Sequence, residues 1–309
     1  MKTISLLLHE DVYASSIGGV IDLLHGTNQY LLASGRPEAF RLELVEEKAI
    51  DKVSRTHLVI IPGFKGDTSA ILHKYGDVVR WIGDMHRSGA EIASMCVGSF
   101  FLAEAGLLDG KAATSHWAAA EEMQRRYPLV KVQSDRIITD QDGIYTSGGA
   151  FVALKLILYM IEKFCGRETA LAVSKMYSMD IDYSSQAHFA VFSGQRQHGD
   201  EEILKSQSYI EVHYASDLSM ELVASLCNTG KRNFIRRFKA ATQNTPIEYL
   251  QRVRIEAAKK VLENEDCPLD EVMGRTGYED VKSFRLVFKR LTGLSPRDYR
   301  KRYSRERKS

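Results

Sequence analysis

The sequence has few cysteines and no long apolar run. Only four of its 309 residues are cysteine, and no two of them are spaced as C-x-x-C. This argues against a zinc site and against a disulfide framework, so a reducing cytoplasm is the simplest compartment. No stretch of about 18 apolar residues is present, which argues against a membrane span. We therefore expect a cytoplasmic protein with no metal, no cofactor and no membrane partner.

The composition is that of an ordinary globular protein. Hydrophobic residues make up 44% of the chain and charged residues 27%, so a sizeable core is possible. The length exceeds what one domain needs, because domains commonly hold about 150 residues. We expect two domains.

The small net charge of +2 conceals an asymmetry between the two ends of the chain. Residues 1–200 hold 20 Lys and Arg against 24 Asp and Glu, whereas residues 231–309 hold 21 against 11. A basic segment joined to a mildly acidic one indicates a polyanionic partner for the basic part, although a solvated basic surface is an equally simple explanation of charge alone.

The first part of the chain alternates strand and helix signals. Short apolar runs at residues 4–8, 58–61 and 91–95 are typical of strands buried on both faces. Helical patterns lie between them, which predicts an α/β fold with a parallel sheet sandwiched by helices. We expect this domain to span 1–193, a polar glycine-containing linker to span 194–206, and an all-α domain to span 207–309.

The C-terminal part repeats itself at a spacing of 50 residues. Ten pairs match in one register: Glu221 with Glu271, Leu222 with Val272, Phe234 with Phe284, Phe238 with Phe288, Lys239 with Lys289, Thr242 with Thr292, Thr245 with Ser295, Pro246 with Pro296, Glu248 with Asp298, and Tyr249 with Tyr299.

Each copy contains two short helical patterns separated by a break with glycine. The first copy has them at 220–226 and 231–241, and the second at 269–275 and 281–291. Two short helices joined by such a turn form a helix-turn-helix unit. Each copy then ends in a helix start, in which Thr245 or Ser295 precedes proline and an acidic residue, as in a capping box.

The second helix of each unit carries cations. Phe234 and Phe238 share one face, so Arg232, Asn233 and Arg236 can point outward. Arginine can bind guanine through two hydrogen bonds, and asparagine can bind adenine in the same way. The second copy offers three further candidates for DNA contact, which are Lys282, Ser283 and Arg285.

A helical pattern over 246–263 connects the copies. A helix of roughly 17 residues is about 26 Å long, which is of the same order as the distance of about 34 Å between successive major grooves. Such a spacer can place two recognition helices in neighbouring grooves. An all-helical regulatory module with a basic surface is the alternative.

From about Tyr209 to Tyr303 the chain resembles an AraC/XylS-type DNA-binding domain. In that family the first recognition helix typically contacts bases, which implicates Arg232 and Arg236. The chain departs from the family at Leu286, where arginine is frequent, and at Gly274, where alanine is usual. The resemblance is carried by residues 237–239, 245–250, 254–258, 277–280 and 293–300.

The first domain contains a candidate nucleophile. Cys96 follows a predicted strand and precedes a predicted helix, which is the arrangement of a nucleophile elbow. A helix N-terminus favours a thiolate, and His116 could act as its base. Gly63, after its own strand, could present a backbone N–H to the same pocket. A small buried cysteine in a tight turn and a core histidine are the simpler interpretation.

Residues 1 to about 190 resemble the class I glutamine amidotransferase-like superfamily, which includes PfpI-type proteases. Superfamily members often supply an acidic side chain beside the cysteine, and the best-matching position here is Ser15, with Glu10 and Asp11 close by in sequence. The combination of domains is similar to the GlxA-like regulators. The resemblance implies a small-molecule pocket that includes Cys96, Val97, His116, Gly63 and Ser15, and it is carried by residues 60–63, 95–98, 102–110 and 114–117.

We therefore expect a sequence-specific transcription regulator that binds double-stranded DNA, is controlled by a small-molecule effector, forms a homodimer and is not an enzyme. The alternative is a cysteine-dependent hydrolase or amidase with an accessory DNA-binding domain. A redox sensor at Cys96 ranks below both, because no second cysteine lies close in sequence.

Overall fold

A computed structural model describes residues 1–181, 185–196 and 198–304. The chain divides into two compact units, one that ends at Ala187 and one that begins at His188. Each unit has its own hydrophobic core, and each is described separately below.

The N-terminal unit is built on a six-stranded sheet with the order β2-β1-β3-β4-β8-β7. Neighbouring strands are parallel except for β7 and β8, which form an antiparallel pair at one edge. A second, two-stranded parallel sheet contains β5 and β6. The strands are β1 (Lys2–Leu8), β2 (Phe40–Glu46), β3 (Leu58–Ile61), β4 (Glu91–Ser94), β5 (Ala112–Ala113), β6 (Lys131–Val132), β7 (Ile138–Gln141) and β8 (Ile144–Ser147).

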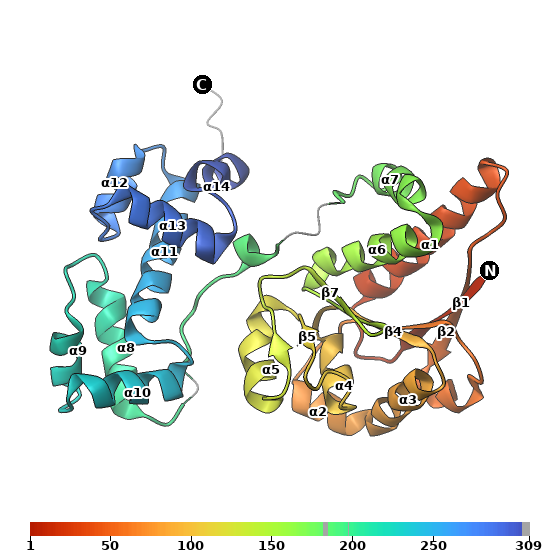
Figure 1. Ribbon diagram of the computed structural model, residues 1–309, viewed down its shortest axis with the longest axis horizontal. Helices are drawn as coiled ribbons and strands as arrows, with labels where there is room; N and C mark the ends of the chain where they lie inside the picture. The colour runs from red at the N-terminus through yellow and green to blue at the C-terminus, as the bar shows by residue number, and fades with distance from the viewer. Residues whose placement is uncertain (182–184, 197, 305–309) are drawn as a thin grey trace. The chain divides into compact units, whose positions relative to one another are not determined.

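Helices cover both faces of the main sheet (Figure 1). Helices α1, α6 and α7 pack on one face over Ile4, Leu6 and Ile60, and α2, α3 and α4 pack on the other over Val59 and Ile61. The helices of this unit are α1 (Ala14–Ala33), α2 (Thr68–Lys74), α3 (Gly76–Arg87), α4 (Ser99–Glu104), α5 (Ala120–Arg126), α6 (Leu154–Cys165) and α7 (Arg167–Met176), with short 3₁₀ turns η1 (Glu47–Lys52), η2 (Cys96–Gly98), η3 (Trp117–Ala119) and η4 (Ala150–Ala153).

The three strands expected from apolar runs are present as β1, β3 and β4. Residues 58–61 of β3 are all buried, because helices cover the strand on both sides. This confirms an α/β fold with a mainly parallel sheet between helical layers. The loops that follow β3 and β4 lie at the carboxyl edge of the sheet, where open α/β sheets bind their ligands.

The C-terminal unit is all helical in the residues described. A further 3₁₀ turn, η5 (Ala187–Phe189), spans the division between the units. The helices are α8 (Glu201–His213), α9 (Met220–Leu226), α10 (Lys231–Thr242), α11 (Pro246–Asn264), α12 (Leu269–Arg275), α13 (Val281–Thr292) and α14 (Pro296–Tyr303).

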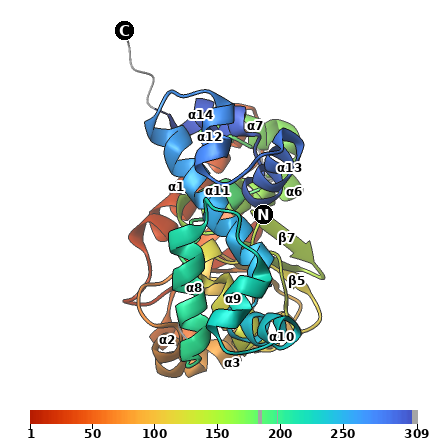
Figure 2. The same cartoon turned by 90° about the vertical axis from the view of Figure 1, so that its left-hand side faces the viewer.

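Two three-helix groups lie at opposite ends of α11. Both views show α8, α9 and α10 at one end and α12, α13 and α14 at the other (Figures 1 and 2). Each group has its own apolar cluster, centred on Phe234 and Phe238 in the first and on Phe284 and Phe288 in the second. All four rings are fully buried. The 50-residue repeat in the sequence is thus a repeat of structure.

The expected helix starts are present. Thr245 forms a complete capping box with Glu248, since its hydroxyl accepts from the backbone N–H of Glu248 and the Glu248 carboxylate accepts from the backbone N–H of Thr245. Ser295 caps α14 by accepting from the backbone N–H of Asp298, but the Asp298 carboxylate accepts from the Ser295 hydroxyl instead of the backbone. The shorter acidic side chain gives only half of the box.

Helix α8 begins inside the segment that we expected to be a linker, residues 194–206. Asp200 caps the helix by accepting from the backbone N–H of Ile203, and Ile203 is fully buried in the first apolar cluster. Further upstream, Phe192 packs edge-on against Tyr249. The polar residues of this stretch therefore include the cap of a helix, and not only a connection between domains.

None of the helices in residues 1–181, 185–196 and 198–304 is long and apolar enough to cross a membrane. The same residues contain no group of three or more His, Cys, Asp or Glu side chains placed to hold a metal ion.

Candidate DNA interface and effector site

Helix α10 presents a polar face opposite its buried phenylalanines. Arg232, Asn233 and Arg236 are all exposed. Asn233 donates to the hydroxyl of Thr229 at 2.8 Å, and Arg236 donates to the side-chain oxygen of Asn233 at 2.8 Å. The guanidinium of Arg236 is therefore held by a short relay from the turn before the helix, while Arg232 makes no hydrogen bond or ion pair with other described residues.

Arg237 contacts the start of another helix, whereas Arg232 and Arg236 lie on the exposed face of α10. It is half-buried and forms a two-point ion pair with Asp200 at the start of α8. Burial alone would raise the pKa of the Asp200 carboxyl, but hydrogen bonds from Arg237 and from the backbone of Ile203 hold it below its usual value. Arg237 thus fixes α10 to α8 and is not available to a ligand.

Helix α13 presents the corresponding face in the second unit. Lys282, Ser283 and Arg285 are exposed, and Asp280 caps the helix by accepting from the backbone N–H of Ser283 at 2.6 Å. The structure therefore places all six DNA-contact candidates on the solvent side of the second helix of a helix-turn-helix unit.

Cys96 occupies a sharp turn directly after β4. Its φ angle is +56°, which is rare for a residue other than glycine and costs free energy. The loop after β3 touches it, because a Cβ added to Gly63 would lie only 2.9 Å from the Cβ of Cys96. Only glycine allows this approach. The hydroxyls of Ser99 and Ser115 each donate to the Cys96 carbonyl at 3.1 Å, which holds the strained turn in place.

The Cys96 thiol is buried, with only 4% of the residue exposed. Burial raises the pKa of the thiol, although hydrogen bonds from the backbone of Ala150 and Val97 act in the opposite direction. The thiol form therefore prevails at neutral pH. We expected the helix N-terminus to stabilise a thiolate. The sulfur at the start of η2 has too little access to solvent for the charged form to be favoured.

His116 follows Ser115, whose hydroxyl donates to the Cys96 carbonyl, but the ring of His116 offers no free acceptor nitrogen to the thiol. Its Nδ1 accepts from the backbone N–H of Ala118 at 3.1 Å, capping η3. Burial lowers the pKa of the ring, which favours the neutral form. Because Nδ1 accepts a hydrogen bond, the neutral ring carries its proton on Nε2. A nitrogen that carries a proton cannot accept one from a thiol. The remaining candidate, Ser15, is exposed in the first turn of α1.

The turn after β8 completes the site, and its residues were not among those expected from the sequence. A Cβ on Gly149 would lie 2.0 Å from the His116 ring, and the backbone of the next residue, Ala150, bonds to the Cys96 sulfur. The side-chain oxygen of Gln186 accepts from the backbone N–H of Gly149, and its side-chain nitrogen donates to the carbonyl of Ser115 at 3.0 Å. A Gly-Gly pair after a strand was the available signal, whereas nothing local marks Gln186.

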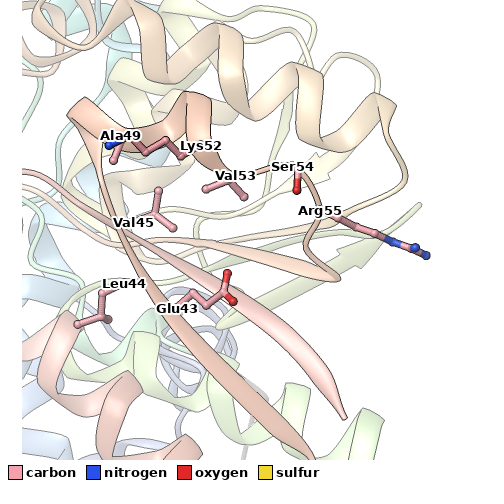
Figure 3. Close-up of a pocket in the computed structure, with 8 residues that line it drawn as sticks. All are labelled: Glu43, Leu44, Val45, Ala49, Lys52, Val53, Ser54 and Arg55. Atoms are coloured by element: carbon pink, nitrogen blue, oxygen red, sulfur yellow. The ribbon is translucent and has the colours of Figure 1, made fainter.

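A cavity of about 410 Å³ lies elsewhere in this unit, beside the edge strand β2 (Figure 3). It is lined by Glu43, Leu44 and Val45 of β2 and by five residues from the stretch 49–55. None of the five expected pocket residues contributes to it. It is therefore a separate candidate for small-molecule binding.

Comparison with known proteins identifies both parts of the chain. A DJ-1/PfpI family model matches residues 38–163, and a helix-turn-helix domain model matches residues 223–302. The HTH-type transcriptional regulator GbdR of Pseudomonas aeruginosa is 24% identical over 97% of this chain and 84% of its own length. The chain is an AraC-family transcriptional regulator with a DJ-1/PfpI-type N-terminal domain.

Further relatives are similar to parts of the chain. The HTH-type transcriptional regulator GlxA of Rhizobium meliloti is 26% identical over 71% of this chain and 67% of its own length. A crystal structure of a putative transcriptional regulator from Vibrio parahaemolyticus has a TM-score of 0.50 and 20% identity over 57% of this chain and 98% of its own, which shows a shared fold. These relatives are named as transcriptional regulators and not as enzymes. The helix-turn-helix domain of the regulator binds DNA.

Proposed function

We propose that this AraC-family regulator reads its DNA targets through α10 and α13 and responds to a small molecule that binds beside Cys96. The observation that carries the DNA part is the repeated exposed polar face. Two helices with matching buried phenylalanines each direct their polar side chains to solvent from opposite ends of one helix, α11. A helix of 19 residues is about 28 Å long, which suits two successive major grooves.

In this proposal the residues that contact DNA are Arg232, Asn233 and Arg236 of α10 and Lys282, Ser283 and Arg285 of α13. Arg236 is the best placed, because its relay to Asn233 limits the freedom that it loses on binding. Lys282 suits a phosphate contact, because an ammonium group is a point charge without the planar fork of arginine.

Replacement of Arg232 by alanine tests this assignment. A residue that reads a base should contribute about 1–3 kcal/mol to specific binding, so Arg232→Ala should lose about five- to 150-fold in affinity for a selected duplex and lose preference at one position. Arg125→Ala is a matched control, since Arg125 is an exposed arginine of α5 in the other unit. Unchanged discrimination by Arg232→Ala in a gel-shift titration would remove its assigned role.

The effector site that we propose contains Cys96, Val97, His116, Gly63 and Ser15, at the carboxyl edge of the sheet. Three loops meet there, after β3, β4 and β8. The buried thiol favours binding over catalysis, since it is not in the thiolate form that nucleophilic attack requires, and the proton-free nitrogen of His116 already accepts from the backbone of Ala118.

Gln186 offers a physical route from this site to the other unit. Only 1% of it is exposed, and its side chain joins the loop of His116 to the Gly149 turn. It lies two residues before the second unit begins. A ligand that displaces either loop must change the hydrogen bonds of Gln186. The conformation of the chain that follows Gln186 changes with them. Coupling of this kind requires the effector to bind the two arrangements with different affinities.

A metabolite panel screened by thermal shift on the full chain tests the effector site. A compound that raises the melting temperature should lose its effect in Cys96→Leu, which fills the site, and keep it in Cys165→Leu, a control at a half-buried cysteine of α6. Gln186→Ala should retain binding but weaken the influence of the compound on DNA affinity. Loss of the thermal shift in Leu44→Ala with Cys96→Leu unaffected would assign the effector to the β2 cavity instead.

We also propose that the regulator acts as a homodimer, which would double the number of base-reading helices on one target. Sedimentation equilibrium of the full chain with and without duplex measures this directly. A single monomeric species at micromolar concentration in both conditions would exclude it.

A further inference from the structure

Helix α13 carries one exposed apolar side chain in the middle of its cationic face. Leu286 is 68% exposed, although leucine usually avoids such exposure. One turn to either side along the helix lie Lys282 and Arg290, and Ser283 and Lys289 flank it at three residues. All four are exposed. No apolar neighbour on this face of α13 shelters the leucine from water.

The position of Leu286 is the centre of the exposed face. At about 100° of rotation per residue, Leu286 lies about 160° from both Phe284 and Phe288, on opposite sides of the helix axis. Those two rings anchor the helix in its core. Leu286 therefore projects straight away from the body of the domain, which is the direction from which a duplex must approach a recognition helix.

The repeat shows what stands at the same place in the first unit. A shift of 50 residues places Leu286 on Arg236 and Lys289 on Lys239. Arg236 is exposed and held by Asn233. The two helices thus present the same outline with different chemistry at the central position, a guanidinium in α10 and an isobutyl group in α13.

The major groove offers one apolar group for such a side chain, the 5-methyl group of thymine. The cations around Leu286 match the phosphates on either side of a groove, and they make this face unsuitable for an apolar protein surface. We propose that Leu286 is a specificity-determining residue that selects thymine by contact with its methyl group. This inference rests on the proposed DNA-reading function of α13.

The second unit then reads its half of the target by shape and apolar contact, whereas the first reads by hydrogen bonds. The two halves of the target differ accordingly. A guanine opposite α10 satisfies Arg236, and a thymine opposite α13 satisfies Leu286. The leucine adds no charge, so it should affect base preference without changing the salt dependence of binding.

Deoxyuridine substitution tests this directly, because deoxyuridine keeps every hydrogen-bonding group of thymidine and lacks only the methyl. A duplex is first selected from a random library with the full wild-type chain, and each thymine is then replaced singly. We expect one position at which the substitution weakens wild-type binding about three- to tenfold, the loss anticipated for one buried methyl group.

The same substitution should cost Leu286→Ala little, since the partner of the methyl group is already absent. Val212→Ala, at an apolar side chain of α8 that is 73% exposed, should behave as wild type. Leu286→Ile should retain the thymine preference, and Leu286→Arg should replace it with guanine. Melting curves should be unchanged in Leu286→Ala, because the side chain contacts solvent.

Several results overturn the proposal, and they can be told apart. If wild type selects a specific duplex but tolerates deoxyuridine everywhere, or if Leu286→Ala retains the full deoxyuridine penalty, Leu286 does not contact a thymine methyl. If Leu286→Ala binds every duplex as wild type does and yet fails to support transcription with purified polymerase, the leucine serves a protein partner. If wild type selects no duplex at all, the proposed DNA-reading function fails together with this inference.

Discussion

At the scale of single residues, the candidate effector site is defined by the backbone of Cys96 and by what surrounds its sulfur. A positive φ angle at a residue other than glycine is retained only where the surroundings hold it. Here the carbonyl of Cys96 accepts two hydroxyl hydrogen bonds, and Gly63 packs against its Cβ. The cysteine occupies a strained strand-to-helix turn, and burial of its thiol favours the protonated form.

The reactivity of Cys96 should follow from this burial. Because the pKa of its thiol is raised, the thiolate fraction at pH 7 is smaller than for a free cysteine, and alkylation by iodoacetamide should be slow. The rate should increase as the pH rises toward and beyond the usual thiol value of about 8.5. Mass spectrometry of the Cys96 peptide measures the rate, with the unfolded chain as the control. Rapid alkylation of the folded chain at pH 7 would contradict the protonated state.

The polar face of α10 shows why a residue type does not by itself assign a role. Arg232, Arg236 and Arg237 are neighbours in one basic run, yet only the first two are free to meet DNA. Arg237 is bound to Asp200, a residue 37 positions away in sequence. That pairing depends on how α8 packs against α10, so it cannot be predicted from the local sequence.

At the scale of elements, five of the C-terminal helices, α9 to α13, were predictable almost to the residue, whereas the start of α8 was taken for part of a linker. Expected helices at 220–226, 231–241, 246–263, 269–275 and 281–291 correspond to α9–α13 with differences of at most one residue. Caps and breaks are local signals, since a threonine or serine before proline starts a helix and a glycine ends one. The internal repeat doubled each signal.

Strands β2, β7 and β8 were not singled out from the sequence. β2 is an edge strand in which only Phe40 and Val45 are buried, and it has no continuous apolar run. β8 is fully buried but contains Thr146 and Ser147, whose hydroxyls find partners only in the folded sheet, on Thr139 and on the carbonyl of Ser94. Such strands have no continuous apolar run, so this signal does not predict them.

The capping box of α11 should make a measurable contribution to stability. Thr245→Ala removes both the hydroxyl that caps the helix and the partner of Glu248, and should lower the free energy of unfolding by about 1 kcal/mol. Thr245→Ser keeps the hydroxyl and is the matched control. Chemical denaturation monitored by circular dichroism gives both values. An equal loss in the two variants would show that the methyl group, and not the cap, matters.

At the scale of the whole molecule, the polar stretch before residue 207 belongs structurally to the C-terminal unit. Ile203 is buried there, Lys259 donates to the carbonyl of Ala190, and Phe192 packs on Tyr249. We expected sensing in 1–193 and DNA binding in 207–309, but the contacts indicate that a stable DNA-binding part needs the residues in between.

Two fragments test this division. A fragment of residues 188–309 should fold and unfold cooperatively, whereas a fragment of residues 207–309 should be less stable, because it lacks the Asp200 cap, the buried Ile203 and the Arg237 ion pair. Burial of one isoleucine alone contributes about 1.5–3 kcal/mol. Thermal melts of the two fragments give the comparison, and equal melting temperatures would return the boundary to residue 207.

The alternation of strands and helices in the first part, the repeated helix-turn-helix units and the outward cations on α10 and α13 follow from local sequence. Each depends on residue type and on spacing within a few turns of chain. Packing of the folded chain, in contrast, buries the Cys96 thiol, engages His116 with Ala118, joins two loops of one site through Gln186, and pairs Arg237 while leaving Arg232 free. Protonation state and hydrogen-bond partners depend on burial and on groups distant in sequence, and these exist only once the chain has packed.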